Sequence, residues 1–540
     1  MTKPRLKYFG WGREGEGMTP EEEDFAFRRL EARFGIARSD GVPAPRLEDI
    51  ELRAPRIAPP ASLVPICSME PYDRAAHCYG KAYPDYVRAL QGDFEPAPDV
   101  VAYPHSEADI AALLDWAGET QSAVTPFGGG SSVVGGVEPR VGGLRCKAAL
   151  TIDLREMGRV LEIDRSSRAA RIQAGAYGPA LEAALKPHGL TLRHFPQSFE
   201  YSSLGGWIAT RSGGHFATLY THIDDLVESL RVVTPRGILE SRRLPGSGAG
   251  PSPDRLIIGS EGILGIIVEA WMRLQDRPRF RAGSAVRFGD FFAAARALRV
   301  ISQAGLFPAN CRILDPEEAW NTGAGDGKTV IMVLGFESAD HPVEPWMSRA
   351  LECCRDHGGQ AETPGAEDAH REGAAGRWRN AFMRMPYTRE RTIRCAIIND
   401  TFETAITWER FETLHDQVKA STEAAIRQAT GRAGEVTCRV THVYPDGPAP
   451  YFTFTVPGQH GRLLEQWQAI KSAGLDAVIA AGGTVTHHHA VGRHHRPWYD
   501  RQRPPLFADA LKAAKQALDP QALLNPGVLI DPASESPGGC

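Results

Sequence analysis

PFGGGSS, residues 126–132, follows a short β-rich run and continues into the sequence VVGG. Consecutive glycines allow positive φ and turn successive backbone N–H groups toward one anion, as a bound pyrophosphate requires. The loop has neither the GxGxxG spacing of a dinucleotide-binding motif nor the lysine of a phosphate-loop ATPase. On its own it indicates either an anion-binding loop or an ordinary flexible connection.

Two further glycine-rich loops follow, QSFEYSSLGGWIATRSGGH at 197–215 and GSEGILGII at 259–267. Three such loops beside short strands favour one extended phosphorylated cofactor that is gripped at several points. The candidate cofactor-binding residues are Pro126, Phe127, Gly128, Gly129, Gly130, Ser131, Ser132, Gln197, Ser198, Phe199, Glu200, Tyr201, Ser202, Ser203, Gly206, Trp207, Ile208, Ala209, Glu261, Gly262, Ile263, Leu264, Gly265, Ile266 and Ile267.

The sequence around these loops predicts an α+β fold. From about residue 100 to 275, short strands alternate with short helices, and a helix is predicted over Ser106–Glu119. Beyond about residue 277 the predicted helices and strands are longer. We expect an N-terminal helical and extended region (1–94), a cofactor-binding domain (95–277), a substrate or cap domain (278–490) and a C-terminal segment that returns to the cofactor domain (491–540).

Two local patterns predict particular elements. Thr19, Pro20 and Glu22 form a capping box with proline at the first helical position, and Gly35 ends that helix. The segment at residues 448–456, PAPYFTFTV, predicts a strand. Tyr451 shares one face of this strand with two threonines, and the phenylalanines occupy the other face. We therefore expect the phenylalanines to be buried and Tyr451 to face a polar space.

A histidine triplet occupies residues 487–489 within THHHAVGRHHRPWY. Affinity tags lie at termini, whereas structured-looking sequence follows this triplet. In an extended strand His487 and His489 would share one face and His488 the other. The pattern admits a His-x-His metal pair or a cluster for proton transfer and phosphate binding.

Arginine is concentrated between residues 371 and 395, where lysine is absent and only Glu372 and Glu390 are acidic. Arginine without lysine suits fork-like recognition of carboxylate or phosphate, although a solvated helix face gives the same pattern. The arginines are Arg371, Arg377, Arg379, Arg384, Arg389, Arg391 and Arg394.

Composition limits the class of protein. The 540 residues predict two to four domains, and a formal charge of −5 argues against general nucleic-acid binding. The nine cysteines show no zinc or thioredoxin spacing, which indicates a reducing compartment. We see no leader peptide and no apolar run long enough to span a membrane, so we expect a cytoplasmic protein that is at most peripheral to a membrane.

The three loops in this order, with VTPRGILE at 233–240 between the last two, resemble the FAD-binding domain of the vanillyl-alcohol oxidase and p-cresol methylhydroxylase superfamily. Within it, the chain resembles the alkyldihydroxyacetonephosphate synthase family from GWG at 10–12 to LLNPG at 523–527. The most specific pieces are MPYTRE at 385–390, FET at 402–404, TCRVTHVY at 437–444, the Tyr451 strand and THHHAVG at 486–492.

This resemblance implies a two-subdomain FAD-binding domain and an α+β cap domain with an antiparallel sheet. It assigns substrate binding to Arg389 and His487, and catalysis to Tyr451, His488 and His489; no metal is implied. Such enzymes bind acyl-dihydroxyacetone phosphate and a fatty alcohol, and use FAD without net redox change. The flavin N5 nitrogen displaces the fatty acid, and the alcohol then attacks the covalent adduct. We expect the FAD to be noncovalent, and a homodimer is left open.

The chain also departs from the family pattern. The strand YFTF has fewer tyrosines, and Ala490 follows the triplet where the family often has glycine. The peroxisomal address of animal members is not found, which favours a bacterial-type cytoplasmic enzyme.

Two other functions compete with the synthase. The first is an FAD-dependent dehydrogenase or oxidase of a 2-hydroxy acid, in which Arg389 binds carboxylate and His488 or His489 takes the hydroxyl proton. The second is a metal-binding protein that uses His487 and His489 with His494 or His495.

Overall fold

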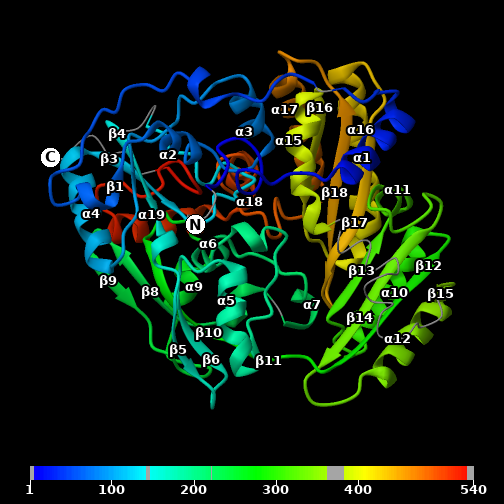
Figure 1. Ribbon diagram of the computed structural model, residues 1–540. Coiled ribbons are helices and arrows are strands. Elements are labelled where there is room, and N and C mark those ends of the chain that lie inside the picture. Colours follow the sequence, from blue (N-terminus) through cyan, green and yellow to red (C-terminus); the bar gives the residue numbers. More distant parts are fainter. Residues whose placement is uncertain (1–4, 40, 142–145, 221, 362–381, 532–540) are drawn as a thin grey trace.

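The computed structural model describes residues 5–39, 41–141, 146–220, 222–361 and 382–531. Figure 1 shows two bodies of mixed helix and sheet side by side, one holding the smaller sheets and the other a single large antiparallel sheet. This arrangement confirms the predicted α+β class. None of the described helices is long and apolar enough to cross a membrane.

The first body contains a four-stranded sheet in the order β1-β2-β4-β3 and a five-stranded sheet in the order β5-β6-β10-β8-β9. Strands β2 and β3 both pair in parallel with β4, whereas the five-stranded sheet is antiparallel. A two-stranded pair joins β7 to β11. The strands are β1 (Cys67–Ser68), β2 (Val100–Ala102), β3 (Ser122–Phe127), β4 (Ala148–Asp153), β5 (Val160–Asp164), β6 (Ala169–Gln173), β7 (Leu190–Thr191), β8 (Val227–Thr234), β9 (Gly237–Glu240), β10 (Ile266–Arg273) and β11 (Gln275–Asp276).

Short helices cover these sheets. The helix predicted over Ser106–Glu119 is α4 (Glu107–Thr120), and its buried leucines share one core with β3 and β4. The other helices of this body are α2 (Pro71–Ala76), α5 (Gly178–Leu185), α6 (Leu204–Thr210), α8 (Ile223–Leu226) and α9 (Pro253–Ile257). Two more short helices, α3 (Tyr83–Leu90) and α7 (Ala217–Tyr220), contact elements of the second body instead.

The second body is built on a seven-stranded sheet in the order β15-β12-β14-β13-β17-β18-β16. All its pairings are antiparallel, as the resemblance implied. The strands are β12 (Phe280–Phe288), β13 (Asn310–Leu314), β14 (Val330–Ser338), β15 (Gln360–Ala361), β16 (Ile397–Glu403), β17 (Glu435–Val443) and β18 (Pro448–Pro457).

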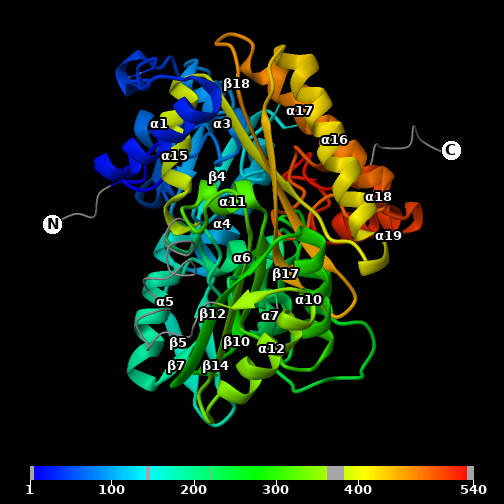
Figure 2. The same cartoon turned by 90° about the vertical axis from the view of Figure 1, so that its right-hand side faces the viewer.

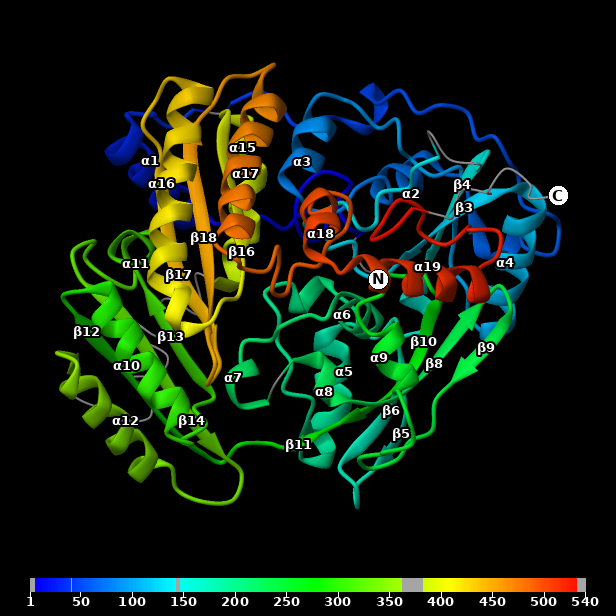
Figure 3. The same ribbon diagram turned by 180° about the vertical axis from the view of Figure 1, so that it is seen from behind.

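Helices lie on both faces of this sheet. One face packs against α10 (Phe291–Gln303), α12 (Glu344–Asp356), α16 (Phe411–Thr430) and α17 (Leu463–Ala480), as Figure 3 shows from behind. In Figure 2, α1 (Pro20–Phe34) and α15 (Pro386–Arg394) lie on the opposite side of β18 from α16. The short helix α11 (Pro316–Asn321) packs against β13, β14 and β17.

Both local predictions hold. Thr19 caps α1, with its side chain accepting from Glu22 N, and Gly35 ends the helix in the left-handed region at φ 66°. In β18, Phe452 and Phe454 are fully buried in the core, whereas Tyr451 and Thr453 line a cavity. The alternation of side chains along the strand therefore separates core from cavity as expected.

The C-terminal segment packs against the glycine-loop sheet. Val124 of β3 donates its N–H to the carbonyl of Leu523 at 2.8 Å and accepts from Asn525 N at 2.8 Å. This segment follows α18 (Arg496–Gln502) and α19 (Pro505–Leu518). Residues 523–525 therefore pair with β3, the strand that leads into the first glycine loop.

The arginine run joins the N-terminal segment to α15. Arg384 forms an ion pair with Glu22 at 2.7 Å, Arg391 pairs with Glu23, and the Arg394 guanidinium donates to the carbonyl of Val42 at 2.7 Å. Arg371, Arg377 and Arg379 lie outside the described residues. These three arginines thus hold carboxylates or carbonyls of residues 22–42, near the start of the chain.

Candidate active site

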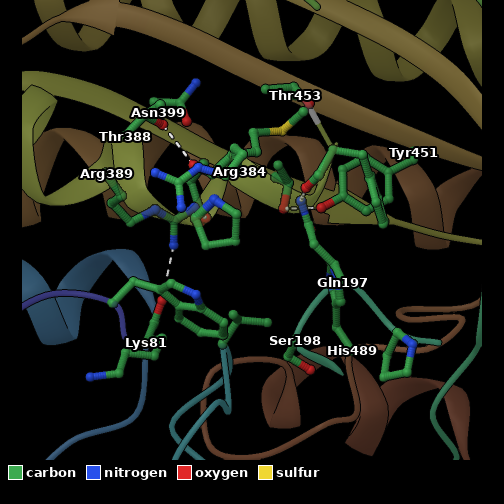
Figure 4. A pocket seen from close by; sticks show the side chains of 18 of the residues that line it. Lys81, Gln197, Ser198, Arg384, Thr388, Arg389, Asn399, Tyr451, Thr453 and His489 are labelled. Carbon is green, nitrogen blue, oxygen red and sulfur yellow. Dashed lines mark hydrogen bonds and ion pairs between the residues drawn. The ribbon is translucent and has the colours of Figure 1, made fainter. Parts of the chain in front are cut away.

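A cavity of about 1010 Å³ lies between the glycine loops of the first body and strands β16 to β18 of the second. Figure 4 shows Arg389, hydrogen-bonded to Lys81, on one side of the cavity and Tyr451 with His489 on the other. Gln197 and Ser198 of the second glycine loop lie below Arg389 and Tyr451 in this view, near His489. Residues from both bodies therefore face one space.

The first two glycine loops lie against each other so closely that side chains would not fit. A Cβ atom on Gly129 would lie 1.9 Å from the carbonyl oxygen of Tyr201, and one on Gly128 would lie 2.1 Å from Ser203 Oγ. Across the described residues, the backbone N–H groups of Gly129, Gly130 and Ser131 donate to no protein acceptor. Free N–H groups beside a large cavity suit a pyrophosphate, so the residues present fit FAD.

Most predicted cofactor residues of these two loops line the cavity, namely Gly128, Gly129, Gly130, Ser131, Ser132, Gln197, Ser198, Ser202, Ser203, Gly206 and Trp207. Several neighbours do not line it, namely Pro126, Phe127, Phe199, Glu200, Tyr201, Ile208 and Ala209. The side chains of Phe127, Tyr201 and Ile208 are buried instead. Their direct contact with FAD stays a prediction.

The third loop lies behind the cavity. Ile263, Leu264, Ile266 and Ile267 belong to the apolar core, and none of Glu261, Gly262 and Gly265 lines the cavity. The buried carboxylate of Glu261 accepts the N–H groups of Val491 at 2.9 Å and Gly492 at 2.7 Å. This loop therefore anchors the segment after the histidine triplet, and its contact with FAD stays a prediction.

The histidine triplet is a bend rather than a strand, so the expected sharing of faces by His487 and His489 does not apply. The reason is the buried carboxylate of Glu403 at the end of β16. It accepts the backbone N–H groups of His488 at 3.1 Å and His489 at 2.9 Å, and that of His487 as well. Three successive N–H groups that converge on one carboxylate bend the backbone around it.

Burial sets the protonation of this cluster. Burial lowers the pKa of His488 and His487 well below 6.5, with the neighbouring imidazoles adding to the effect, and lowers the pKa of His489 as well. Burial alone would raise the pKa of Glu403, but the adjacent His489 and His487 and the hydrogen bond from Thr486 lower it to about 2. At neutral pH the cluster therefore combines an ionised carboxylate with neutral imidazoles that can accept protons.

A chain of hydrogen bonds leads away from the triplet. His488 Nδ1 lies 2.9 Å from His487 Nδ1, His487 Nε2 lies 2.7 Å from the Tyr444 hydroxyl, and that hydroxyl lies 2.6 Å from His222 Nε2. Imidazole and hydroxyl groups both donate and accept. The chain can therefore carry a proton from His488 to His222.

Tyr451 lies beside this cluster. Its ring packs under the Arg439 guanidinium, 4.0 Å from the ring centroid, and stacks on His488 at 6.1 Å. Its hydroxyl donates to Thr401 Oγ1 at 3.1 Å. Burial raises the pKa of Tyr451 although Arg439 opposes the effect, so the hydroxyl stays protonated at neutral pH.

Arg389 is held by β16 and the N-terminal region. Its guanidinium donates to the Lys81 carbonyl at 3.0 Å and to Asp400 Oδ1 at 3.1 Å. Asp400 also lies 3.3 Å from Lys471 Nζ, and both cations line the cavity. Burial would raise the pKa of Asp400, but Lys471 and Arg389 lower it to about 2. One ionised carboxylate thus positions two cations beside the space where an anionic substrate would lie.

Two site residues escaped the sequence patterns, Glu403 and His442. Thr441 and His442 are consecutive in β17, yet both line the cavity, because a register shift between Val440 and His442 interrupts the alternation of the strand. A β-bulge leaves no clear signal in a single sequence. Glu403 lies in the segment FET, but its partners are more than 80 residues away.

The metal alternative gains only limited support. Among the described residues, His442, His487 and His488 place nitrogens within 4.8 Å of one another, a different set from the expected His487 and His489 pair. Both ring nitrogens of His487 already form the hydrogen bonds to His488 and Tyr444. This geometry favours proton transfer over metal binding.

Known proteins share this architecture. Residues 98–241 match the family described as FAD binding domain, and residues 277–529 match FAD linked oxidases, C-terminal domain. A solved p-cresol methylhydroxylase with substrate bound has the same fold, with a TM-score of 0.68 at 14% identity over 87% of this chain and 94% of that chain. The fold is thus the two-subdomain FAD-binding type with a cap domain, and the protein is an FAD-using enzyme.

Alkyldihydroxyacetonephosphate synthases are similar over most of the chain. The protein of that name from Dictyostelium discoideum is 31% identical over 490 residues, which span 86% of this chain and 78% of that protein. A solved alkyldihydroxyacetonephosphate synthase has a TM-score of 0.79 at 25% identity and covers 96% of this chain and 98% of its own. Because the Dictyostelium relative is eukaryotic, the bacterial-type assignment stays a prediction. This identity over most of both chains, together with the matching FAD-binding fold, shows that the chain belongs to the alkyldihydroxyacetonephosphate synthase family.

Proposed function

We propose that the protein exchanges the acyl chain of acyl-dihydroxyacetone phosphate for a long-chain fatty alcohol, with no net redox change. One observation carries this proposal beyond the family relation. The cavity does not end at Tyr451 but continues along β18, past Thr453 and Thr455, to residues of α1 and α11. A small 2-hydroxy acid needs no such extension.

The length of the extension suits an alkyl chain. Side chains on one strand face recur every two residues, so Tyr451 and Thr455 lie roughly 13 Å apart at about 3.3 Å per residue. Phe25, Leu30 and Trp320 contribute apolar surface at the far end, beside polar groups such as Glu435. An extended hydrocarbon chain could lie along β18 with its reacting end near Tyr451.

The glycine loops would hold the cofactor. The N–H groups of Gly129, Gly130 and Ser131 would bind the FAD pyrophosphate, because they have no acceptor among the described residues. When bound, FAD supplies a nucleophilic ring nitrogen, N5, for the substitution at the substrate carbon. A nucleophile of this kind divides one difficult displacement into two easier steps.

Arg389 would bind the substrate phosphate. Among the described residues, Lys81 and Asp400 accept two of its five N–H groups, which leaves donors for a phosphate oxygen. Lys471, held by the same Asp400, adds a second positive charge at the cavity. His487 was expected to bind substrate too, but its ring nitrogens bond to His488 and Tyr444, so we assign it to proton transfer.

Tyr451, His488 and His489 would move protons at the reacting carbon. Tyr451 Oη is a protonated donor, and His488 is a neutral acceptor stacked against the same ring. A proton accepted by His488 can pass through His487 and Tyr444 toward His222 along the hydrogen-bonded chain. Acid and base groups placed in this way match the removal and return of the proton next to the ketone.

The test supplies purified FAD-bound protein with acyl-dihydroxyacetone phosphate and a long-chain alcohol, and looks for the ether product and free fatty acid by mass spectrometry. We expect both products without oxygen consumption or dye reduction. The rival is a 2-hydroxy acid dehydrogenase or oxidase, which the match to FAD linked oxidases supports. Steady dye reduction by a 2-hydroxy acid, with no ether product, would replace our proposal with that rival.

A further inference from the structure

A second cluster of potential metal ligands lies outside the cavity. Asp85 of α3, Glu138 and His494 each place one ligand atom within 4.8 Å of the others. None of the three lines the cavity. Asp85 is 1% exposed and Glu138 is fully buried, so both carboxylates are removed from water.

The polar atoms of this cluster are incompletely bonded. Asp85 Oδ2 accepts the N–H of Ala82 at 3.0 Å, and Glu138 Oε1 accepts from Arg140 at 2.8 Å and from Arg88 at 3.5 Å. Within the described part of the chain, Asp85 Oδ1, Glu138 Oε2 and both ring nitrogens of His494 are buried without a hydrogen-bond partner. Each carboxylate therefore has one oxygen that accepts hydrogen bonds from the described residues and one oxygen that accepts none.

Such a concentration of unpaired buried atoms needs a physical explanation. A buried polar atom without a partner destabilises the folded state, and a charged one does so more strongly. Native structures contain few such atoms, and an unseen ion is one of the usual reasons for them. Two carboxylate oxygens and an imidazole nitrogen are ligands that Zn²⁺ accepts, with a water molecule completing a tetrahedral set.

We propose that Asp85, Glu138 and His494 bind one divalent transition-metal ion, with Zn²⁺ the best match to the ligand set. The ion has a structural role and does not depend on the reaction proposed above. It joins three separate parts of the chain: the N-terminal region through α3, the segment after the first glycine loop, and the turn that follows the histidine triplet.

The packing around His494 shows why the ion bears on cofactor binding. A Cβ atom on Gly135 would lie 2.9 Å from His494 Nε2, and the N–H of His494 donates to the carbonyl of Val134 at 3.1 Å. The N–H of Lys81 donates to the carbonyl of Ser132. Metal binding therefore holds the segment that leaves the glycine loop between two flanking parts of the chain.

Metal analysis of the FAD-bound protein, grown with added zinc, tests the proposal. We expect close to one zinc per chain, and an anomalous diffraction peak at the zinc edge between Asp85, Glu138 and His494. After mild chelator treatment of the same holoenzyme, Zn²⁺ alone should raise Tm by a few degrees, because an ion that binds only the folded state stabilises it. Glu138→Gln and His494→Gln should each lose the bound zinc and this rise in Tm.

The matched control is His415→Gln, which alters another buried histidine that belongs to neither metal-ligand cluster. It should retain zinc at the wild-type level. The proposal is overturned if neither Zn²⁺ nor Mn²⁺ binds the treated holoenzyme, or if Glu138→Gln and His494→Gln hold as much metal as wild type. An anomalous peak at His442, His487 and His488 instead would also overturn it.

Discussion

Glu403 Oε1 accepts the backbone N–H of His489 at 2.9 Å, across 86 residues of sequence. The same carboxylate accepts the two preceding N–H groups and the hydroxyl of Thr486 at 2.6 Å. The direction of the three imidazoles of the triplet is thus set by an acid that does not line the cavity. Glu403 is a positioning residue in this arrangement.

Glu403→Gln should disturb the triplet without removing a reacting group. Glutamine has one acceptor oxygen in place of two, and hydrogen bonds to a charged group contribute about 1.5–3 kcal/mol each. We expect a lower free energy of unfolding in urea and a lower kcat with FAD still bound. Because the pKa of Glu403 is lowered to about 2 in the folded protein, its contribution to stability is present above pH 4.5 and lost as pH falls toward 2. Between pH 4.5 and pH 2 the free energy of unfolding of Glu403→Gln should therefore fall less than that of wild type. Equal falls in the two proteins would count against this role.

Tyr451→Phe should remove turnover while leaving the fold and cofactor intact. The ring keeps its packing against Arg439 and His488, and only the hydroxyl bonded to Thr401 is lost. A general acid or base contributes on the order of 10²–10⁴-fold, which sets the expected fall in kcat. Tyr83→Phe is the control, because the Tyr83 hydroxyl bonds only weakly to a backbone carbonyl at 3.4 Å. A similar loss in both variants would argue against catalysis by Tyr451.

Arg389→Lys should weaken substrate binding more than it alters FAD content. Lysine keeps the charge but cannot bridge Lys81, Asp400 and a phosphate in one plane. Loss of one charge-assisted bond of about 1.5–3 kcal/mol corresponds to an apparent KM that rises roughly 10- to 150-fold. Arg391→Lys, on the same helix and paired with Glu23, should leave KM unchanged. Equal KM values in the two variants would exclude a phosphate contact by Arg389.

Gly129→Ala should abolish tight FAD binding. Its methyl group would lie 1.9 Å from the Tyr201 carbonyl oxygen, and since that contact is with backbone, the two glycine loops must separate. We expect at least about a tenfold loss of affinity for FAD, equivalent to about 1.4 kcal/mol, measured by flavin fluorescence after reconstitution. Gly248→Ala is the control, because its methyl group would meet no atom within 4 Å.

The FAD of the wild-type protein should be noncovalent, so denaturation should release free FAD into solution. Flavin that stays with the denatured chain would reveal a covalent link.

Buried neutral histidines should make the protein acid-sensitive. Burial lowers the pKa of His194 to about 3, below its ordinary value of 6.5. Below pH 6.5 the unfolded chain binds a proton that the folded protein does not, so stability falls by up to about 1.4 kcal/mol per pH unit for this residue. Between pH 7 and pH 5, the free energy of unfolding of His194→Gln, measured in urea, should therefore fall by about 2 kcal/mol less than that of wild type. If the unfolding free energies of the two proteins change equally with pH, His194 is not neutral in the folded protein.

Local patterns in the sequence predicted elements well. The capping box at Thr19 and the alternation around Tyr451 gave α1 and the two faces of β18, because both depend on neighbouring residues. The antiparallel cap sheet and the FAD-binding type came from the resemblance rather than from periodicity. The first two glycine loops were found as cavity walls for the same local reason, since close backbone approach requires glycine.

Long-range pairing could not be predicted in the same way. The bend at His487 depends on Glu403, and the orientation of His442 depends on a bulge in β17. The arginine run suggested anion binding, yet Arg384 and Arg391 pair with glutamates of α1. Such partners are set by tertiary packing, which a motif does not encode.

The pairing of the N-terminal segment with α15 also has a consequence for synthesis of the chain. Lys7 forms an ion pair with Glu390 at 2.8 Å, a separation of 383 residues. At about 5–20 residues per second, the ribosome needs roughly 20–75 s to make the second partner after the first. For that time α1 has no surface of α15 to dock on, so one wall of the cavity can close only when most of the polypeptide has left the ribosome.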